Sequence, residues 1–311
     1  MGKIVFCFPG QLQEKPVWDS SHPLKRDPYF IQCLERASVQ SGFDLLNFSF
    51  RTGEDDFNLK LQIATYLLSM IHFYRLRAAG WTPDILAEHS MGIYAALAAS
   101  EAVTFEEGLC ITESIGRLLQ RMGKSSQGAM VSIIGLPLEE VQGICRDLNG
   151  YSLFIANHNG SKHYVLSGEE KGIEEAVSLA LSQKAISATR LTFQTALHSP
   201  SLLSLKEEIE EILRPIRVCS PTFPILNHWT IQPLRKEEIK GFLAQEIGQP
   251  VYWAQCVERL IQEKVTQFIE VGQEATLTKL IRWIDREVDA FCSGDRLPSL
   301  PCHPEPGSKS G

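Results

Sequence analysis

The sequence lacks several features that would assign it to other classes of protein. Its 311 residues contain no uninterrupted apolar run near the roughly 18 residues of a membrane span. Lys and Arg are not clustered, and a net charge of -7 argues against a surface for nucleic-acid phosphates. The start of the chain shows no cleavable signal pattern and no myristoylation signature. We therefore expect neither membrane nor nucleic acid as a partner, and a cytoplasmic location.

Cysteines at metal-binding spacing are also missing. The eight cysteines include no Cys-x-x-Cys pair and have no histidines clustered near them, which argues against a zinc site. Most lie in apolar helix or strand patterns, where a small buried thiol is common. We predict a reduced chain without a bound metal.

The chain is long enough for two domains, with 44% hydrophobic and 22% charged residues. Strand patterns alternating with helical ones, such as 59–78 and 104–122, predict a mostly parallel α/β core. The middle of the chain follows a βαββαβ order, typical of a ferredoxin-like insertion, in segments 129–134, 137–147, 151–156, 163–167, 170–183 and 185–193. The predicted boundaries are 1–123 and 196–292 for the large domain, 124–195 for the small domain and 293–311 for a disordered tail.

A serine stands between an apolar run and a helical pattern, in the sequence Glu88-His89-Ser90-Met91-Gly92. Such a strand-to-helix turn can form a nucleophile elbow, which pushes the serine hydroxyl outward beside the next backbone N–H. Glu88 stands where the usual Gly-x-Ser-x-Gly pattern has its first glycine. By itself the match leaves open an ordinary helix start capped by a serine.

Seven short motifs along residues 4 to about 285 resemble the malonyl-CoA:acyl-carrier-protein transacylase family, the acyltransferases of fatty-acid and polyketide synthesis. They are Phe8-Pro9-Gly10-Gln11, His89-Ser90-Met91-Gly92, Gly128-Ala129-Met130 with Ile133-Ile134-Gly135-Leu136, Asn157-x-Asn159, Leu197-His198-Ser199-Pro200, Pro250-Val251-x-Trp253 and Glu270-Val271-Gly272. The resemblance implies an α/β-hydrolase-like large domain that carries the serine and a ferredoxin-like small domain.

On the pattern of that family, Ser90 is the nucleophile and His198 its general base, in a cleft between the domains. An imidazole suits this role because its ordinary pKa lies near neutrality. The resemblance further implies an oxyanion hole from the backbone N–H groups of Gln11 and Met91. A backbone carbonyl within 246–250, rather than an acid, is expected to orient His198.

The chain departs from the family at the residue that binds the malonyl carboxylate. Malonyl-selective members use the arginine of an Arg-Gly pair one helix beyond the serine, and an ungapped alignment places Ile115 and Gly116 there. Arg117 lies two positions further, about 200° around the helix. Malonyl is therefore not the expected acyl group.

Three further residues are predicted to line the acyl pocket. If Glu88 faces the pocket, its charge repels an anionic acyl group; alternatively it points away into a polar contact behind the elbow. Leu197, directly before His198, and Asn157 of the Asn-x-Asn motif complete the predicted lining.

We therefore expect a serine acyltransferase that moves an uncharged or amino-bearing acyl group between thioesters of coenzyme A or acyl-carrier protein, with no bound cofactor. The same serine and histidine also fit a hydrolase that edits acyl-carrier thioesters, and a scaffold without activity is a third hypothesis. An acidic carrier needs a basic docking patch, for which the candidates are Arg117, Arg121 and Lys124.

Overall fold

The computed structural model describes residues 2–12, 27–41, 43–45, 48, 50, 56–125 and 128–296. The large domain is built on a parallel sheet of five strands, in the order β7-β2-β1-β8-β9. Its strands are β1 (Lys3–Phe8), β2 (Ile85–Glu88), β7 (Ile225–Leu226), β8 (Val265–Glu270) and β9 (Asp289–Cys292). In a parallel sheet all carboxyl ends lie at one edge, where loops can gather a site.

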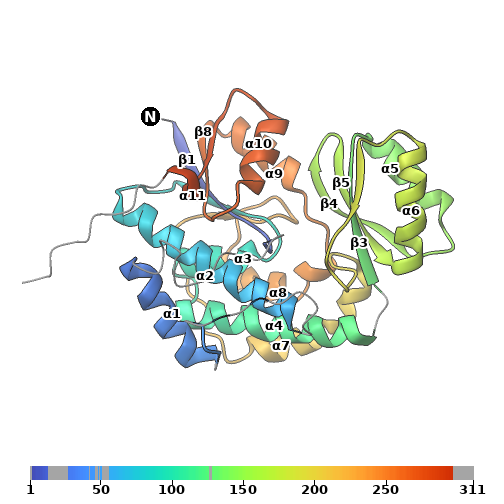
Figure 1. The fold of residues 1–311 in the computed structure, drawn as a ribbon. Helices are drawn as coiled ribbons and strands as arrows, with labels where there is room; N and C mark the ends of the chain where they lie inside the picture. The colour runs from blue at the N-terminus through green and yellow to red at the C-terminus, as the bar shows by residue number, and fades with distance from the viewer. Residues whose placement is uncertain are drawn as a thin grey trace, which may run out of the picture.

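The central strand β1 is apolar from Ile4 to Phe8, as expected where both faces of a sheet are covered. Side chains alternate along a strand, so Phe6 and Phe8 pack into one core while Val5 and Cys7 pack into the other. Helices on the first face are α1 (Pro28–Ser41), α2 (Phe57–Ala78), α3 (Gly92–Ala99), α4 (Phe105–Ser125), α7 (Lys206–Leu213) and α8 (Ile239–Leu243). The second face is covered by α9 (Trp253–Gln262) and α10 (Thr276–Ile284). Figure 1 shows the two helical layers with the sheet between them.

The small domain is a four-stranded antiparallel sheet in the order β4-β5-β3-β6. Its elements are β3 (Gly128–Ile134), α5 (Leu138–Asp147), β4 (Leu153–Gly160), β5 (His163–Glu169), α6 (Glu170–Ser182) and β6 (Ser187–Arg190). The helices α5 and α6 cover one face with their own apolar core, and this unit stands beside the large domain in Figure 1. The predicted fold class, a parallel α/β domain with a ferredoxin-like insertion, is confirmed.

The end of the folded chain differs from the prediction. Residues Ser293–Arg296 form the short helix α11, and Ser293 is buried, with its hydroxyl donating to the carbonyl of Gly272 at 3.1 Å. The predicted tail at 293 therefore begins too early, because this hydroxyl ties the chain to the loop after β8. Residues 297–311 lie outside the described part of the chain.

The sequence predicted no membrane span and a reduced chain, and the structure bears on both points. Among the helices of the described ranges, none has the length and apolar character needed to cross a bilayer. The seven cysteines in the described ranges are all free thiols.

Candidate active site

Ser90 lies on a tight turn between β2 and α3, at the carboxyl edge of the parallel sheet. Its φ is 57°, in the left-handed region that non-glycine residues rarely adopt. Gly92 allows this turn to approach β1, since a Cβ there would lie 2.3 Å from the carbonyl oxygen of Phe8. The hydroxyl is consequently pushed out of the backbone, as the elbow pattern predicts.

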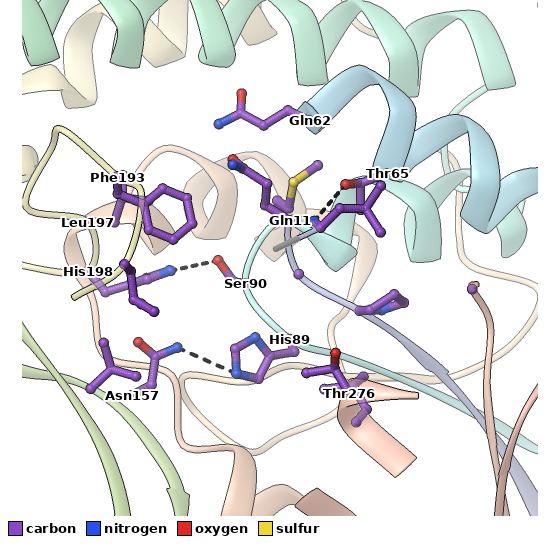
Figure 2. A pocket seen from close by; sticks show the side chains of 18 of the residues that line it. Gln11, Gln62, Thr65, His89, Ser90, Asn157, Phe193, Leu197, His198 and Thr276 are labelled. Atoms are coloured by element: carbon purple, nitrogen blue, oxygen red, sulfur yellow. Dashed lines mark hydrogen bonds between the residues drawn. The ribbon is translucent and has the colours of Figure 1, made fainter. Parts of the chain in front are cut away.

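His198 faces Ser90 from the loop that returns from the small domain. Its Nε2 lies 2.7 Å from the Ser90 hydroxyl oxygen, as Figure 2 shows. Its Nδ1 lies 2.9 Å from the carbonyl oxygen of Gln249 and 3.2 Å from that of Glu246. Because carbonyls only accept hydrogen bonds, Nδ1 carries the proton and Nε2 presents its lone pair to the serine. Both carbonyls lie within the segment 246–250 expected to orient this ring.

The ring of His198 is held neutral by its surroundings. Burial, assisted by the charge of His228, lowers its pKa to about 3, although the hydrogen bonds to the two carbonyls act in the opposite direction. The backbone is also strained here, with φ of 55°, and is fixed by the N–H of His198 donating to the carbonyl of Ile247 at 2.7 Å. A neutral imidazole in this position is ready to accept a proton.

His89 connects the turn to the small domain. Its Nε2 lies 3.0 Å from Asn159 Oδ1, and its ring packs edge-on against Trp253 with centroids 5.8 Å apart. Burial lowers the pKa of His89 to about 4. Asn157 is next to it, with Nδ2 3.4 Å from the same His89 nitrogen, so two asparagines of β4 lie against the elbow.

A cavity of about 260 Å³ opens between the two domains at this point. Ser90, His198, Gln11, Met91 and Asn157 all line it. Gln11 and Met91 thus line the same cavity as the serine, and their role as the oxyanion hole stays a prediction. Apolar side chains make up much of the remaining wall: Leu12, Leu68, Ile115, Leu119, Met130, Val165, Leu191, Phe193 and Leu197.

The cavity offers no cationic side chain among the described residues. Its charged lining residues are Glu246 and Glu274, and neither Lys nor Arg is among the lining residues that the described ranges contribute. Ile115 is 1% exposed and occupies the wall. Arg117 points away, where it pairs with Glu113 at 2.6 Å. Ile115 thus lies in the cavity wall, and whether this wall selects against a malonyl group stays a prediction.

Glu88 is not a pocket residue, so its prediction as lining was wrong and the alternative position behind the elbow is the observed one. The side chain is fully buried. Its Oε1 accepts the backbone N–H of His228 at 2.8 Å, and its Oε2 lies 2.6 Å from His228 Nδ1. Strand pairing explains the contact: β2 and β7 are parallel neighbours, so Glu88 at the end of β2 lies next to His228, which follows the end of β7.

The residues predicted to dock a carrier protein lie on α4. Arg117 and Arg121 are exposed, and each is paired with a carboxylate, Glu113 and Glu208 respectively, at 2.6 Å. The side chain of Lys124 lies outside the described part of the structure. Docking at this face stays a prediction.

A metal ion has few free donors here. His198, His228 and Glu246 bring ligand atoms within 4.8 Å of one another. However, the Nδ1 of each imidazole is already hydrogen-bonded, and His198 Nε2 faces Ser90. Only His228 Nε2 and one oxygen of Glu246 are left within this trio, fewer than the usual three or four protein ligands of a zinc site.

Sequence reasoning missed the buried polar cluster behind His198. Tyr94 donates its hydroxyl to Glu246 at 2.8 Å, and burial raises the pKa of Glu246 to about 7. The residues of the cluster are far apart in the chain, with 140 positions between Glu88 and His228. The only local signal was the charged residue placed directly before the His-Ser pair.

A serine on a strained elbow, paired with an imidazole between a parallel-sheet domain and a ferredoxin-like domain, defines the class of two-domain serine acyl-transfer enzymes. Residues 42–291 match the acyl transferase domain family. The chain belongs to this family and is an acyltransferase.

Relatives of known activity cover nearly the whole chain. The polyketide biosynthesis malonyl CoA-acyl carrier protein transacylase PksC of Bacillus subtilis (strain 168) is 29% identical over 93% of this chain and 99% of its own. The malonyl CoA-acyl carrier protein transacylase of the same organism is 27% identical over 95% of this chain and 94% of its own.

Solved structures agree with the fold. The malonyl CoA-acyl carrier protein transacylase of Coxiella burnetii superposes with a TM-score of 0.87 at 25% identity, over 94% of each chain. A malonyl-transacylase solved in complex with a type II polyketide acyl-carrier protein gives 0.86 at 25% identity, over 93% of this chain and 95% of its own.

Proposed function

We propose that this protein transfers an uncharged acyl group between thioesters through an ester on Ser90. In the first step the Ser90 oxygen attacks the thioester carbonyl carbon while His198 Nε2 takes the hydroxyl proton. The carbon–sulfur bond then breaks, and His198 returns the proton to the leaving thiolate. The distance of 2.7 Å between Oγ and Nε2 supports this direct proton transfer.

The second half of the reaction reverses these steps with a different thiol. The incoming thiol gives its proton to His198, its sulfur attacks the ester carbonyl, and the Ser90 oxygen leaves and regains the proton. We propose that the backbone N–H groups of Gln11 and Met91 stabilise the negative oxygen that forms twice in this cycle. No redox or metal step is needed for the balance.

The acyl class follows from the wall of the cavity. A malonyl group brings a carboxylate, and a buried carboxylate is costly unless a cation or several hydrogen bonds compensate it. The same cavity wall that contains Ile115 supplies neutral side chains instead, among them Leu68, Thr112 and Leu119. This absence of a cation from the described cavity wall is the observation on which the proposal of an uncharged acyl group depends.

The thiol partners are proposed from the relatives. Their names describe transfer between coenzyme A and acyl-carrier protein, and one similar structure holds a carrier protein bound to a transacylase. We propose the same two thiols here, both of which end in a phosphopantetheine arm, and hence a place in fatty-acid or polyketide-type synthesis.

The test is intact-protein mass spectrometry after exposure to acetyl, butyryl and malonyl thioesters of coenzyme A. We expect acetyl or butyryl adducts on the wild type and none on Ser90→Ala. Adding an acceptor carrier protein should move the acyl group onto its thiol. Loss of the acyl group without an acceptor would instead identify an editing hydrolase, and fast malonyl transfer would contradict the proposed acyl class.

The substitution Ile115→Arg tests the acyl class from the other direction. A guanidinium group in the wall gives a malonyl carboxylate a partner, so we expect the ratio of malonyl to acetyl adduct to rise by roughly tenfold or more. The unliganded variant should melt at a lower temperature, because the new charge is then buried without a partner. The matched control is Ile115→Met, which keeps the volume and should leave the ratio unchanged.

A further inference from the structure

Behind the proposed catalytic pair lies a buried ion pair that the reaction itself does not use. Glu88 and His228 are both completely buried, and the carboxylate holds His228 through two contacts, one to its backbone N–H at 2.8 Å and one to its ring at 2.6 Å. Burying an ion pair brings little net stability in most proteins. Stability alone therefore does not account for this pair.

The position of the pair links the elbow to the loop that orients His198. Glu88 ends β2 two residues before Ser90, and His228 follows the neighbouring strand β7. The His228 ring stands edge-on to the His198 ring, with centroids 5.9 Å apart. Its Nε2 points toward Glu246 Oε2 at 4.0 Å, and neither of these two buried atoms has a hydrogen-bond partner.

Glu246 connects the helix after the elbow to His198 through hydrogen bonds. Its side chain is held by the Tyr94 hydroxyl from α3, the helix that begins after the elbow. Its backbone carbonyl accepts from His198 Nδ1, and His198 Nε2 returns to Ser90. The orientation of the His198 ring thus depends on the turn that contains Glu246. Tyr94 of α3 binds this turn from one side, and His228 faces it from the other.

We propose that Glu88 and His228 are positioning residues for His198: the carboxylate fixes a charged His228 ring, which holds the turn that carries the Glu246 and Gln249 carbonyls and opposes protonation of His198. This inference rests on the proposed function, since it assigns His198 the role of base. Neither Glu88 nor His228 lines the cavity, so neither is expected to contact the substrate.

The charge of His228 follows from its neighbours. Burial alone would lower its pKa, but the charge and hydrogen bond of Glu88, with a smaller effect of Glu246, outweigh burial and raise that pKa above its ordinary value. A positive ring beside His198 then disfavours a second positive ring. Three other titratable groups belong to this buried region: His89 after β2, which acts on the pKa of His198, Tyr94 on α3, which donates to Glu246, and Cys256 on α9, which interacts with Glu88.

Three variants test the proposal: Glu88→Gln, His228→Gln and the double variant. Glu88→Gln keeps the shape of the side chain but removes the charge that stabilises the His228 cation. We expect the rate of Ser90 acylation at saturating thioester to fall roughly 10- to 100-fold, because a misplaced base costs rate, while KM changes less than about threefold. The acid limb of the pH profile should move to higher pH, since the neutral His228 no longer opposes protonation of His198.

The double variant separates folding from positioning. His228→Gln alone leaves a buried carboxylate without its cation, so it is expected to unfold at a lower temperature. The double variant has no charge at positions 88 and 228 and should regain much of the lost thermal stability. The acid limb of its pH profile should nevertheless stay shifted to higher pH. The matched control is Glu270→Gln, another buried carboxylate at the end of a strand of the same sheet, which contacts Thr278 instead of the site. It should leave the pH profile unchanged.

A second measurement does not depend on turnover. Nitrogen-15 NMR of the imidazoles follows the titration of His198 directly, and we expect its pKa to rise in Glu88→Gln and in the double variant. Unchanged titration and acylation rates in folded variants would overturn the inference. A wild-type protein that forms no acyl adduct would contradict the proposed function instead, and the NMR titration would still decide whether the pair acts on His198.

Discussion

At the scale of single residues, the nucleophile was predicted from a short motif because its backbone requirements are local, whereas the base was predicted from the family resemblance. Ser90 needs a tight turn with a small residue two positions later, and Gly92 meets that need within the same motif. The direction of Glu88 had no local determinant. Its partner lies 140 positions away, so the sequence left open whether the carboxylate faced the cavity, and only the pairing of β2 with β7 decides it.

The strain at Ser90 makes a prediction about stability that is separate from chemistry. A non-glycine residue at φ of 57° costs about 1 to 2 kcal/mol relative to a relaxed backbone. Ser90→Gly should therefore be more stable than Ser90→Ala, by roughly 0.5 to 1 kcal/mol after the greater chain entropy of glycine is subtracted. Urea unfolding of the two inactive variants measures the difference. Equal stability would contradict a strained elbow.

At the scale of elements, the long periodic helices α2 and α4 were predicted within three residues of their observed bounds. The sequence analysis overlooked α10, although Leu277, Leu280, Ile281 and Ile284 repeat at helical spacing. Strand β9 has only four residues at the edge of the sheet, too few for a periodic pattern. The strand β9 depends on its pairing with β8, which no local pattern encodes, whereas α10 was overlooked despite a local pattern.

The region of helix α10 is an alternative to α4 as the place where the carrier protein docks. Its residues Thr276, Leu277 and Leu280 line the cavity. Trp283, which is 59% exposed, packs against His163 of the small domain with ring centroids 5.9 Å apart. Lys279 on α10 and Arg286 just after its end are exposed, and we expect these basic side chains to meet an acidic carrier whose phosphopantetheine arm enters the cavity.

Reversing these two charges should weaken recognition of an acidic carrier. We expect Lys279→Glu with Arg286→Glu to raise KM for the carrier roughly 5- to 10-fold, with a smaller effect at high salt, and to leave acylation by a short synthetic thioester unchanged. The matched control is Arg121→Glu on α4, whose guanidinium already pairs with Glu208. A larger effect of Arg121→Glu than of the double variant would favour docking on α4.

At the scale of the whole molecule, composition and element order were enough to predict two domains of different topology. Their relative placement was not accessible, because it depends on contacts between distant segments. The strand β4 of the small domain pairs with the large domain through Asn157 and Val251, and the N–H of Val251 donates to the carbonyl of Ala156 at 2.8 Å. This junction lies directly after the turn that orients His198, so the small domain helps to build the site.

The junction also makes the stability of the molecule sensitive to acid. His163 on β5 hydrogen-bonds Ser132 at 2.9 Å and contacts Trp283 of the large domain. Burial lowers its pKa to about 4, against about 6.5 in the unfolded chain. The unfolded state therefore binds a proton below pH 6.5 that the folded state refuses, and the folded state loses stability as the pH falls toward 4.

Glu246 and Glu270 have the opposite effect on the pH dependence of stability. Burial raises the pKa of each to about 7, so the folded state loses stability as the pH rises from about 4.5 to 7. A comparison of His163→Gln with the wild type cancels these terms, because both proteins contain them. Between pH 7.5 and pH 5 the variant should gain about 2 kcal/mol of unfolding free energy relative to the wild type. Urea titrations at the two pH values measure this change. A difference that does not vary with pH would mean that His163 accepts a proton in the folded molecule as easily as in the unfolded chain, and that the contact between the domains does not exclude water from this ring.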